Sequence, residues 1–191
     1  RNRWTEVQPV EACLVLSGSV SPVTAGQIQT ARDNGFATIA IAPEALESEG
    51  RKDSLVADYA TQIATHLRKN RSVVLHSCEG PNDPRLEACR EILGRKGLSQ
   101  REIRSKTARV FGEILGGAGR RALEQASAGR LVVAGGDTSS VVARALGIEA
   151  VEMIAPLYPG APLCRAFAPA SPIDQMEIGR ASCRERVFPV V

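Results

Sequence analysis

The chain has 191 residues, of which 43% are hydrophobic, 24% charged and 4% aromatic. This length and apolar content suit one α/β domain with an aliphatic core and argue against long disorder. The net charge of +3 is too small for a nucleic-acid-binding footprint, and neither a membrane-spanning run nor a signal-peptide pattern is found. We therefore expect a cytoplasmic protein without a nucleic-acid or membrane partner.

Short apolar runs alternate with amphipathic segments along the chain. Buried strands are predicted at residues 12–16, 36–41, 72–77, 130–134 and 150–154. Helices are predicted at 24–34, 53–69, 84–93, 100–115, 118–126 and 139–146, with Gly116 and Gly117 as a break in this pattern. The rhythm favours an α/β fold with a three-layer, doubly wound, mostly parallel sheet of Rossmann-like type.

The cysteines and histidines give no sign of a metal site. The five cysteines are scattered and form no C-x-x-C pair, which favours reduced thiols over a disulfide framework or a zinc site. His66 lies in a helical pattern and His76 in an apolar strand, and neither has a partner at ligand spacing. Both are interpreted as structural.

Three predicted loops each follow a predicted strand directly, at residues 17–23, 77–84 and 135–140. Ligands of open α/β sheets bind beyond the carboxyl ends of the strands. We therefore expect these loops to meet at one edge of the sheet.

Two of these loops combine glycines with hydroxyl side chains at the start of a helix. Gly18 allows a tight turn beside Ser19, while Gly135 and Gly136 precede the hydroxyl of Thr138. The free N–H groups at a helix start favour an anion such as phosphate. Neither loop matches the Walker A or the G-x-G-x-x-G pattern, so ordinary capped turns are the alternative.

Asp137 stands between the glycines and the hydroxyl residues of the second loop. A carboxylate repels phosphate unless a cation lies between them. The favoured interpretation is a helix N-cap, and a contact mediated by Mg²⁺ or water is the alternative.

Four motifs in this order resemble a known family: SGSVSPVTAGQI at 17–28, GPNDPR at 80–85, RLVVAGGDTSSVVARALGI at 130–148 and PGAPLCR at 159–165. They resemble the nucleotide-binding C-terminal domain of the four-carbon acid sugar kinases. The resemblance spans residues 12–176, and its most specific part is GGDTS followed by PGAPLCR. The 159–162 segment is interpreted as a plain connection, with direct ligand contact as the alternative, and Arg165 either approaches phosphate or is solvated or paired with a helix.

The resemblance implies that ATP, with Mg²⁺, serves as phosphate donor to a four-carbon sugar acid such as threonate, erythronate or 3-oxo-tetronate. The residues that it nominates for nucleotide binding are Ser17, Gly18, Ser19, Gly135, Gly136, Asp137, Thr138 and Gly179. A non-catalytic module that binds a nucleotide or another anion is the alternative function.

Two departures from the family pattern limit this expectation. The N-terminal domain that holds the sugar acid has no counterpart here, so we expect a kinase fragment that is inactive alone. The family has a lysine followed by a glycine-rich turn near its C-terminal end. Here Glu177 replaces the lysine, and Gly179 is the one glycine of that turn that is kept. We therefore assign 1–176 to the nucleotide-binding domain and interpret 177–191 as a non-native tail outside the fold. A homodimer is a further expectation.

Overall fold

The computed structural model describes residues 4, 6–47, 50–158 and 161–181 of the chain. Its strands form one sheet in the order β2-β3-β1-β4-β7-β6-β5. The strands are β1 (Cys13–Ser17), β2 (Ala37–Ala40), β3 (Val73–His76), β4 (Arg130–Ala134), β5 (Ala150–Tyr158), β6 (Ala161–Phe167) and β7 (Glu177–Ala181). The helices are α1 (Pro22–Asp33), α2 (Lys52–Leu67), α3 (Pro84–Gly94), α4 (Gln100–Leu123) and α5 (Ser139–Leu146), with a 3-10 turn η1 (Pro43–Glu47).

Most of the sheet is parallel. β1 pairs in parallel with β3 and β4, β3 with β2, and β4 with β7. β6 runs antiparallel to both of its neighbours, β5 and β7. The predicted α/β class and mostly parallel sheet are confirmed, and the antiparallel strand makes the sheet mixed.

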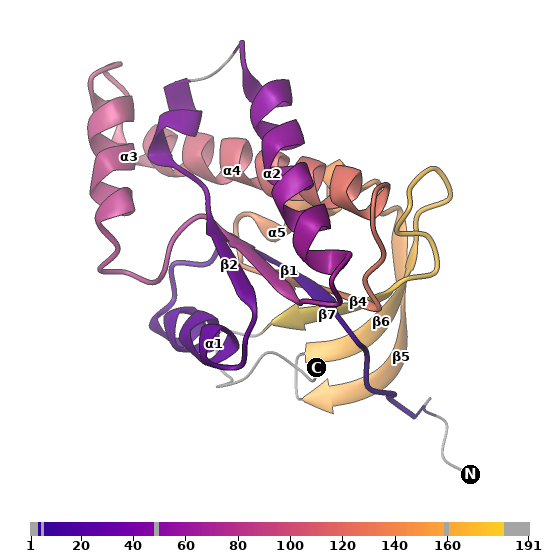
Figure 1. The fold of residues 1–191 in the computed structure, drawn as a ribbon. Coiled ribbons are helices and arrows are strands. Elements are labelled where there is room, and N and C mark those ends of the chain that lie inside the picture. Colours follow the sequence, from indigo (N-terminus) through magenta and orange to yellow (C-terminus); the bar gives the residue numbers. More distant parts are fainter. Residues whose placement is uncertain (1–3, 5, 48–49, 159–160, 182–191) are drawn as a thin grey trace.

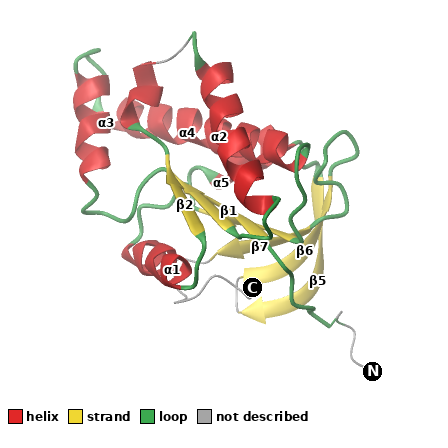
Figure 2. Cartoon of the chain, in the orientation of Figure 1, coloured by secondary structure: helices red, strands yellow, loops and turns green. Residues whose placement is uncertain are grey.

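Helices cover both faces of the sheet (Figures 1 and 2). Alternate residues of β1 point to opposite faces, as the pleat of a strand requires. Cys13 and Val15 pack with Ile28 of α1, whereas Leu14 and Leu16 join the larger core beneath α2, α4 and α5. No described helix has the length and apolarity needed to cross a membrane.

The helices α1 and α3 begin in the same way, directly after a strand and its loop. Ser21 caps α1 by accepting a hydrogen bond from the N–H of Val23, and Pro22 takes the first helical position. Asp83 caps α3 by accepting one from the N–H of Arg85. A capping side chain followed by proline fixes where each helix starts, and hence the shape of the loop before it.

The predicted break at Gly116 and Gly117 is wrong, because α4 runs through both glycines without interruption. A Cβ on Gly116 would lie only 2.8 Å from the carbonyl oxygen of Val142, and one on Gly119 2.8 Å from Leu16 Cδ1. The absence of side chains therefore lets α4 pack closely on α5 and β1. Gly116 and Gly119 serve helix packing here, whereas the sequence pattern predicted a break at Gly116 and Gly117.

The C-terminal third contains more strand than predicted. The strand expected at 150–154 continues to Tyr158 as β5, and Ala161 and Pro162 belong to β6. The interpretation of 159–162 as a plain connection is therefore wrong for its second half, while residues 159–160 lie outside the described residues.

Exclusion of residues 177–191 from the fold is also wrong for the first five of them, which form β7 between β4 and β6. Glu177 Oε2 accepts two hydrogen bonds from the Arg130 guanidinium, from Nε at 3.0 Å and from Nη2 at 2.6 Å. Arg130 is fully buried, so Glu177 neutralises a charge inside the domain. Residues 182–191 lie outside the described part of the chain.

Candidate functional site

The three loops predicted to share one edge of the sheet are joined by backbone hydrogen bonds. The N–H of Gly18 donates to the carbonyl of Ala134 at 2.8 Å, which links the loop after β1 to the end of β4. The N–H of Ser77 donates to the carbonyl of Ser17 at 3.0 Å, which links it to the end of β3. The predicted meeting of these loops at the carboxyl edge is confirmed.

Gly18, Gly135 and Thr138 pack against one another at this edge. A Cβ on Gly18 would lie 2.7 Å from both Cβ and Cγ2 of Thr138, closer than real Cβ atoms come. Gly135 has φ of +138°, and a Cβ there would lie 3.3 Å from the carbonyl carbon of Gly18 and in contact with Thr138 Oγ1. Both positions therefore require glycine, and its absence of a side chain lets the loop after β1 pack directly on the start of α5.

The start of α5 has no side-chain cap. Thr138 occupies the N-cap position, and its side chain makes no capping hydrogen bond. Asp137, which was expected to cap the helix, precedes that position and is exposed. The N–H of Ser139 donates to the carbonyl of Gly136 at 3.4 Å, and the other N–H groups of this first turn suit an anion as acceptor. The N-cap interpretation of Asp137 is wrong, which leaves its carboxylate facing the site.

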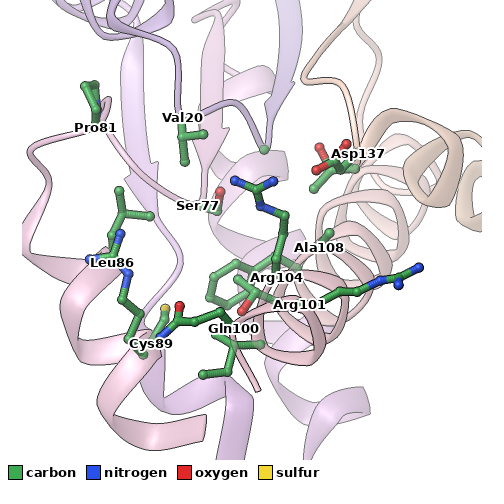
Figure 3. A pocket seen from close by; sticks show the side chains of 16 residues that line it. Val20, Ser77, Pro81, Leu86, Cys89, Gln100, Arg101, Arg104, Ala108 and Asp137 are labelled. Atoms are coloured by element: carbon green, nitrogen blue, oxygen red, sulfur yellow. The ribbon is translucent and has the colours of Figure 1, made fainter. Parts of the chain in front are cut away.

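A pocket of about 620 Å³ opens beside these loops, between α3 and α4 (Figure 3). Apolar side chains of the two helices form one part of its lining: Leu86, Cys89, Ile103, Ala108 and Phe111. Polar and charged residues form another: Ser77, Arg90, Gln100, Arg101, Arg104, Thr107, Asp137 and Thr138. This combination is typical of a site that takes a ligand with an apolar part and an anionic part.

Cys89 contributes to the apolar part of the lining. Burial raises the pKa of its thiol to about 11, so the group stays protonated at neutral pH. A protonated thiol behaves as a small hydrophobic group. Cys89 therefore adds contact surface for a ligand without adding a charge.

The predicted site residues fall into three groups. Gly18, Asp137 and Thr138 line the pocket, with Gly135 packed on Gly18 and Gly136 exposed beside them.

Ser17 and Ser19 lie at the same edge but are buried and do not line the pocket. The hydroxyl of Ser19 bonds to Thr24 Oγ1 at 2.8 Å and accepts from the N–H of Ser21 at 3.3 Å, so it shapes the loop. Gly179 lies within β7, opposite Val132 and two residues before the strand ends beside Ala134. The structure therefore does not bring Gly179 together with the pocket-lining residues.

The side of the pocket that α3 and α4 form was not predicted from the sequence. On α4, Gln100, Arg104, Thr107 and Phe111 all line the pocket. Their spacing of four, three and four residues puts them on one helix face, which is a visible pattern. Nothing in the pattern alone shows that this face is turned toward the phosphate-type loops, because that depends on how α4 packs.

Arg165 lies near the opposite edge of the sheet from these loops. In the sheet register, Arg165 of β6 lies opposite Glu177 of β7. Glu177 in turn lies opposite Arg130, the first residue of β4. Since the loops follow the last residue of β4, a contact between Arg165 and phosphate at this site is excluded by the register.

A buried histidine supports the third loop. His76 is 1% exposed, and its Nε2 lies 3.4 Å from Glu79 Oε1, which also pairs with Arg32 at 2.9 Å. Asp83 accepts from the N–H of Glu79 at 2.6 Å, so the loop between β3 and α3 is tied together. The structural interpretation of His76 agrees with this arrangement, and its ring packs inside the fold near Ser77, which lines the pocket.

The buried imidazole predicts a pH dependence of stability. Burial, followed by the positive charge of Arg85, lowers the pKa of His76 to about 4, although Glu79 opposes the shift. The unfolded chain binds a proton near pH 6.5 and the folded chain only near pH 4, so stability falls as pH drops through this window. The expected loss is at most about 3 kcal/mol. Urea unfolding of His76→Asn should show a flatter profile between pH 7 and 4; an unchanged profile would contradict this account.

A parallel sheet whose glycine loops and uncapped helix start meet at the carboxyl edge is the architecture of nucleotide- and phosphate-binding domains. The comparisons with known proteins make this assignment specific. The family described as the nucleotide-binding C-terminal domain matches residues 14–178. The chain belongs to this family, the nucleotide-binding domain of the four-carbon acid sugar kinases.

Similar kinases are much longer than this chain. It is 40% identical over 173 residues to a 3-oxo-isoapionate kinase from Paraburkholderia graminis, covering 89% of this chain and 35% of that protein. It is 25% identical over 165 residues to a D-threonate kinase from Salmonella typhimurium, covering 86% and 37%. The chain thus spans little more than a third of the length of these relatives.

Solved structures show the same fold. A protein from Haemophilus influenzae superimposes with a TM-score of 0.64 at 19% identity, over 95% of this chain and 39% of that one. A domain of unknown function from Bordetella bronchiseptica, solved as a domain-swapped dimer with bound citrate, gives 0.61 at 18% identity, over 92% and 38%.

Proposed function

We propose that this chain is the ATP-binding part of a kinase that phosphorylates a four-carbon sugar acid. The observation that carries the proposal is the meeting of Gly18 with Gly135 and Thr138 beside the α3–α4 pocket. Backbone N–H groups at this edge suit the phosphates, and the pocket offers apolar surface for the base. Phosphoryl transfer depends mainly on such positioning and on neutralising charge.

The site suits Mg²⁺ that is bound together with the nucleotide. Among the described residues, no group of three His, Cys, Asp or Glu side chains could hold a metal ion. Mg²⁺ in kinase sites is held by one or two carboxylates together with the phosphates of the substrate. Asp137 is the carboxylate that lines the pocket, so it would hold the ion against the phosphates, where the ion would neutralise their charge.

The sugar acid is assigned mainly to the part of the longer relatives that this chain does not match. Those relatives act, by name, on 3-oxo-isoapionate, D-threonate and 3-oxo-tetronate. An acid of this class is therefore the proposed acceptor, with threonate, erythronate and 3-oxo-tetronate as candidates. A homodimer also stays a prediction, supported by the domain-swapped dimer of the Bordetella relative.

Calorimetric titration tests the nucleotide assignment. The folded chain, shown to be folded by cooperative unfolding, is titrated with a non-hydrolysable ATP analogue and Mg²⁺. Saturable binding is expected, with no turnover of a sugar acid by the chain alone. A folded chain that binds no nucleotide would overturn the proposal.

Joining the chain to the preceding part of the Paraburkholderia relative separates a kinase from a non-catalytic module. The joined protein should transfer phosphate from ATP to a four-carbon acid or to 3-oxo-isoapionate. If it binds ATP but transfers no phosphate to any of these acids, the module interpretation is favoured.

A further inference from the structure

Two arginines on the first turns of α4 line the pocket without a carboxylate partner. In the part of the chain that the structure describes, no ion pair involves Arg101 or Arg104, whereas Arg90 on α3 pairs with Glu87 at 2.7 Å. Both residues are exposed, and only Asp137 among the pocket-lining side chains carries a negative charge. The pocket therefore has an excess of positive charge, which favours an anionic ligand.

The two side chains take different directions. In Figure 3 the guanidinium group of Arg104 lies toward the carboxyl edge of the sheet, in the space between Ser77 and Asp137. The side chain of Arg101 extends away from that space along the outside of α4 (Figure 3). Arg104 is thus the arginine placed to reach a group held at the loops.

A buried hydroxyl lies on the same helix face. Thr107 follows Arg104 by three residues, lines the pocket, and its Oγ1 is buried without a hydrogen-bond partner among the described residues. A buried hydroxyl without a partner is rare and unfavourable in a folded protein. A polar ligand in the pocket would supply the missing partner.

We propose that Arg104 binds the phosphate groups of the nucleotide from the α4 side, opposite the N–H groups of the loops. The inference rests on the proposed nucleotide site and adds a residue to it. The planar guanidinium matches two phosphate oxygens at once, a geometry that a lysine ammonium does not reproduce. With the phosphates between Arg104 and the loops, the base faces the apolar lining formed by Leu86, Ile103 and Phe111.

Substitution of Arg104 tests this role by titration of a non-hydrolysable ATP analogue and of AMP with Mg²⁺. Arg104→Gln is expected to weaken binding of the triphosphate by about 10- to 100-fold, the range for a hydrogen-bonded charge contact. The same substitution should reduce the affinity for AMP less, because AMP carries fewer phosphates. Arg104→Lys should bind the triphosphate with an affinity between those of the unmodified chain and Arg104→Gln. The salt dependence of triphosphate binding should also weaken in Arg104→Gln.

Arg109→Gln provides the matched control, because Arg109 is exposed on the same helix and does not line the pocket. It should bind the triphosphate as the unmodified chain does. If the unmodified chain binds the analogue and Arg104→Gln binds it equally well, this inference is overturned and the proposed function stands. If the folded, unmodified chain binds no nucleotide, both are overturned.

Discussion

Gly18→Ala is expected to reduce nucleotide affinity by at least about 100-fold and to lower the free energy of unfolding by about 2 to 3 kcal/mol. The added methyl group would meet Cβ and Cγ2 of Thr138 at 2.7 Å. Relief requires the loop after β1 and the start of α5 to move apart, which displaces the donors on both sides of the proposed phosphate position. Titration with the ATP analogue and urea unfolding measure the two effects.

Two further variants isolate the cause of the Gly18→Ala effect. A Cβ on Gly136 meets nothing within 4 Å, so Gly136→Ala should leave stability unchanged although it lies in the same pair of loops. Removing the opposing side chain in Gly18→Ala/Thr138→Gly should recover part of the stability lost in Gly18→Ala. Additive losses in the double variant would contradict a direct clash between positions 18 and 138.

Glu177→Ala is expected to lower the free energy of unfolding by about 3 to 4 kcal/mol, measured by urea unfolding. The substitution would leave the fully buried guanidinium of Arg130 without its carboxylate partner at 2.6 Å. Burying an unpaired charge is among the most destabilising changes a single substitution makes. The loss should be similar with and without nucleotide, because this pair lies at the start of β4, away from the loops that follow its end.

Glu152→Ala provides the control for this prediction. Glu152 is exposed on β5 and has no ion-pair partner within the described ranges, so its loss should change stability by less than about 0.5 kcal/mol. A small effect of Glu177→Ala would mean that β7 contributes little to the sheet. The segment from Glu177 would then behave as the tail that the sequence pattern predicts.

The carboxyl-edge loops were predictable because their position follows from local pattern and one general rule. Apolar strands followed by loops that begin at Ser17, Ser77 and Gly135 indicate a parallel sheet, and in such sheets the loops after the strands share an edge. The glycines of GGDTS were predicted to lie in a tight turn at a helix start, and Gly135 with its positive φ does so. The pattern did not show that neither Asp137 nor Thr138 caps the helix with its side chain, because both are good capping residues.

The features that were not predicted depend on contacts between segments far apart in the sequence. β6 and β7 were missed because prolines beside Ala161 and a polar stretch after Met176 do not look like strands, and neighbouring strands supply their hydrogen bonds. Gly116 looks like a helix break until α5 is packed against it. Arg104 does not indicate a ligand until α4 lies beside the loops, since an exposed arginine on a helix is ordinary.

Amide chemical shifts provide the most direct measurement for the central claim, that the nucleotide phosphates lie beside the loop after β1 and the start of α5. Two-dimensional ¹⁵N–¹H spectra of the labelled chain are recorded while the ATP analogue and Mg²⁺ are added. The largest shifts are expected at the amides of Gly18, Gly135, Gly136 and Thr138, with smaller ones along the α4 face of the pocket. Shifts confined to the β5–β6 hairpin, with the four loop amides unmoved at saturation, would contradict the claim.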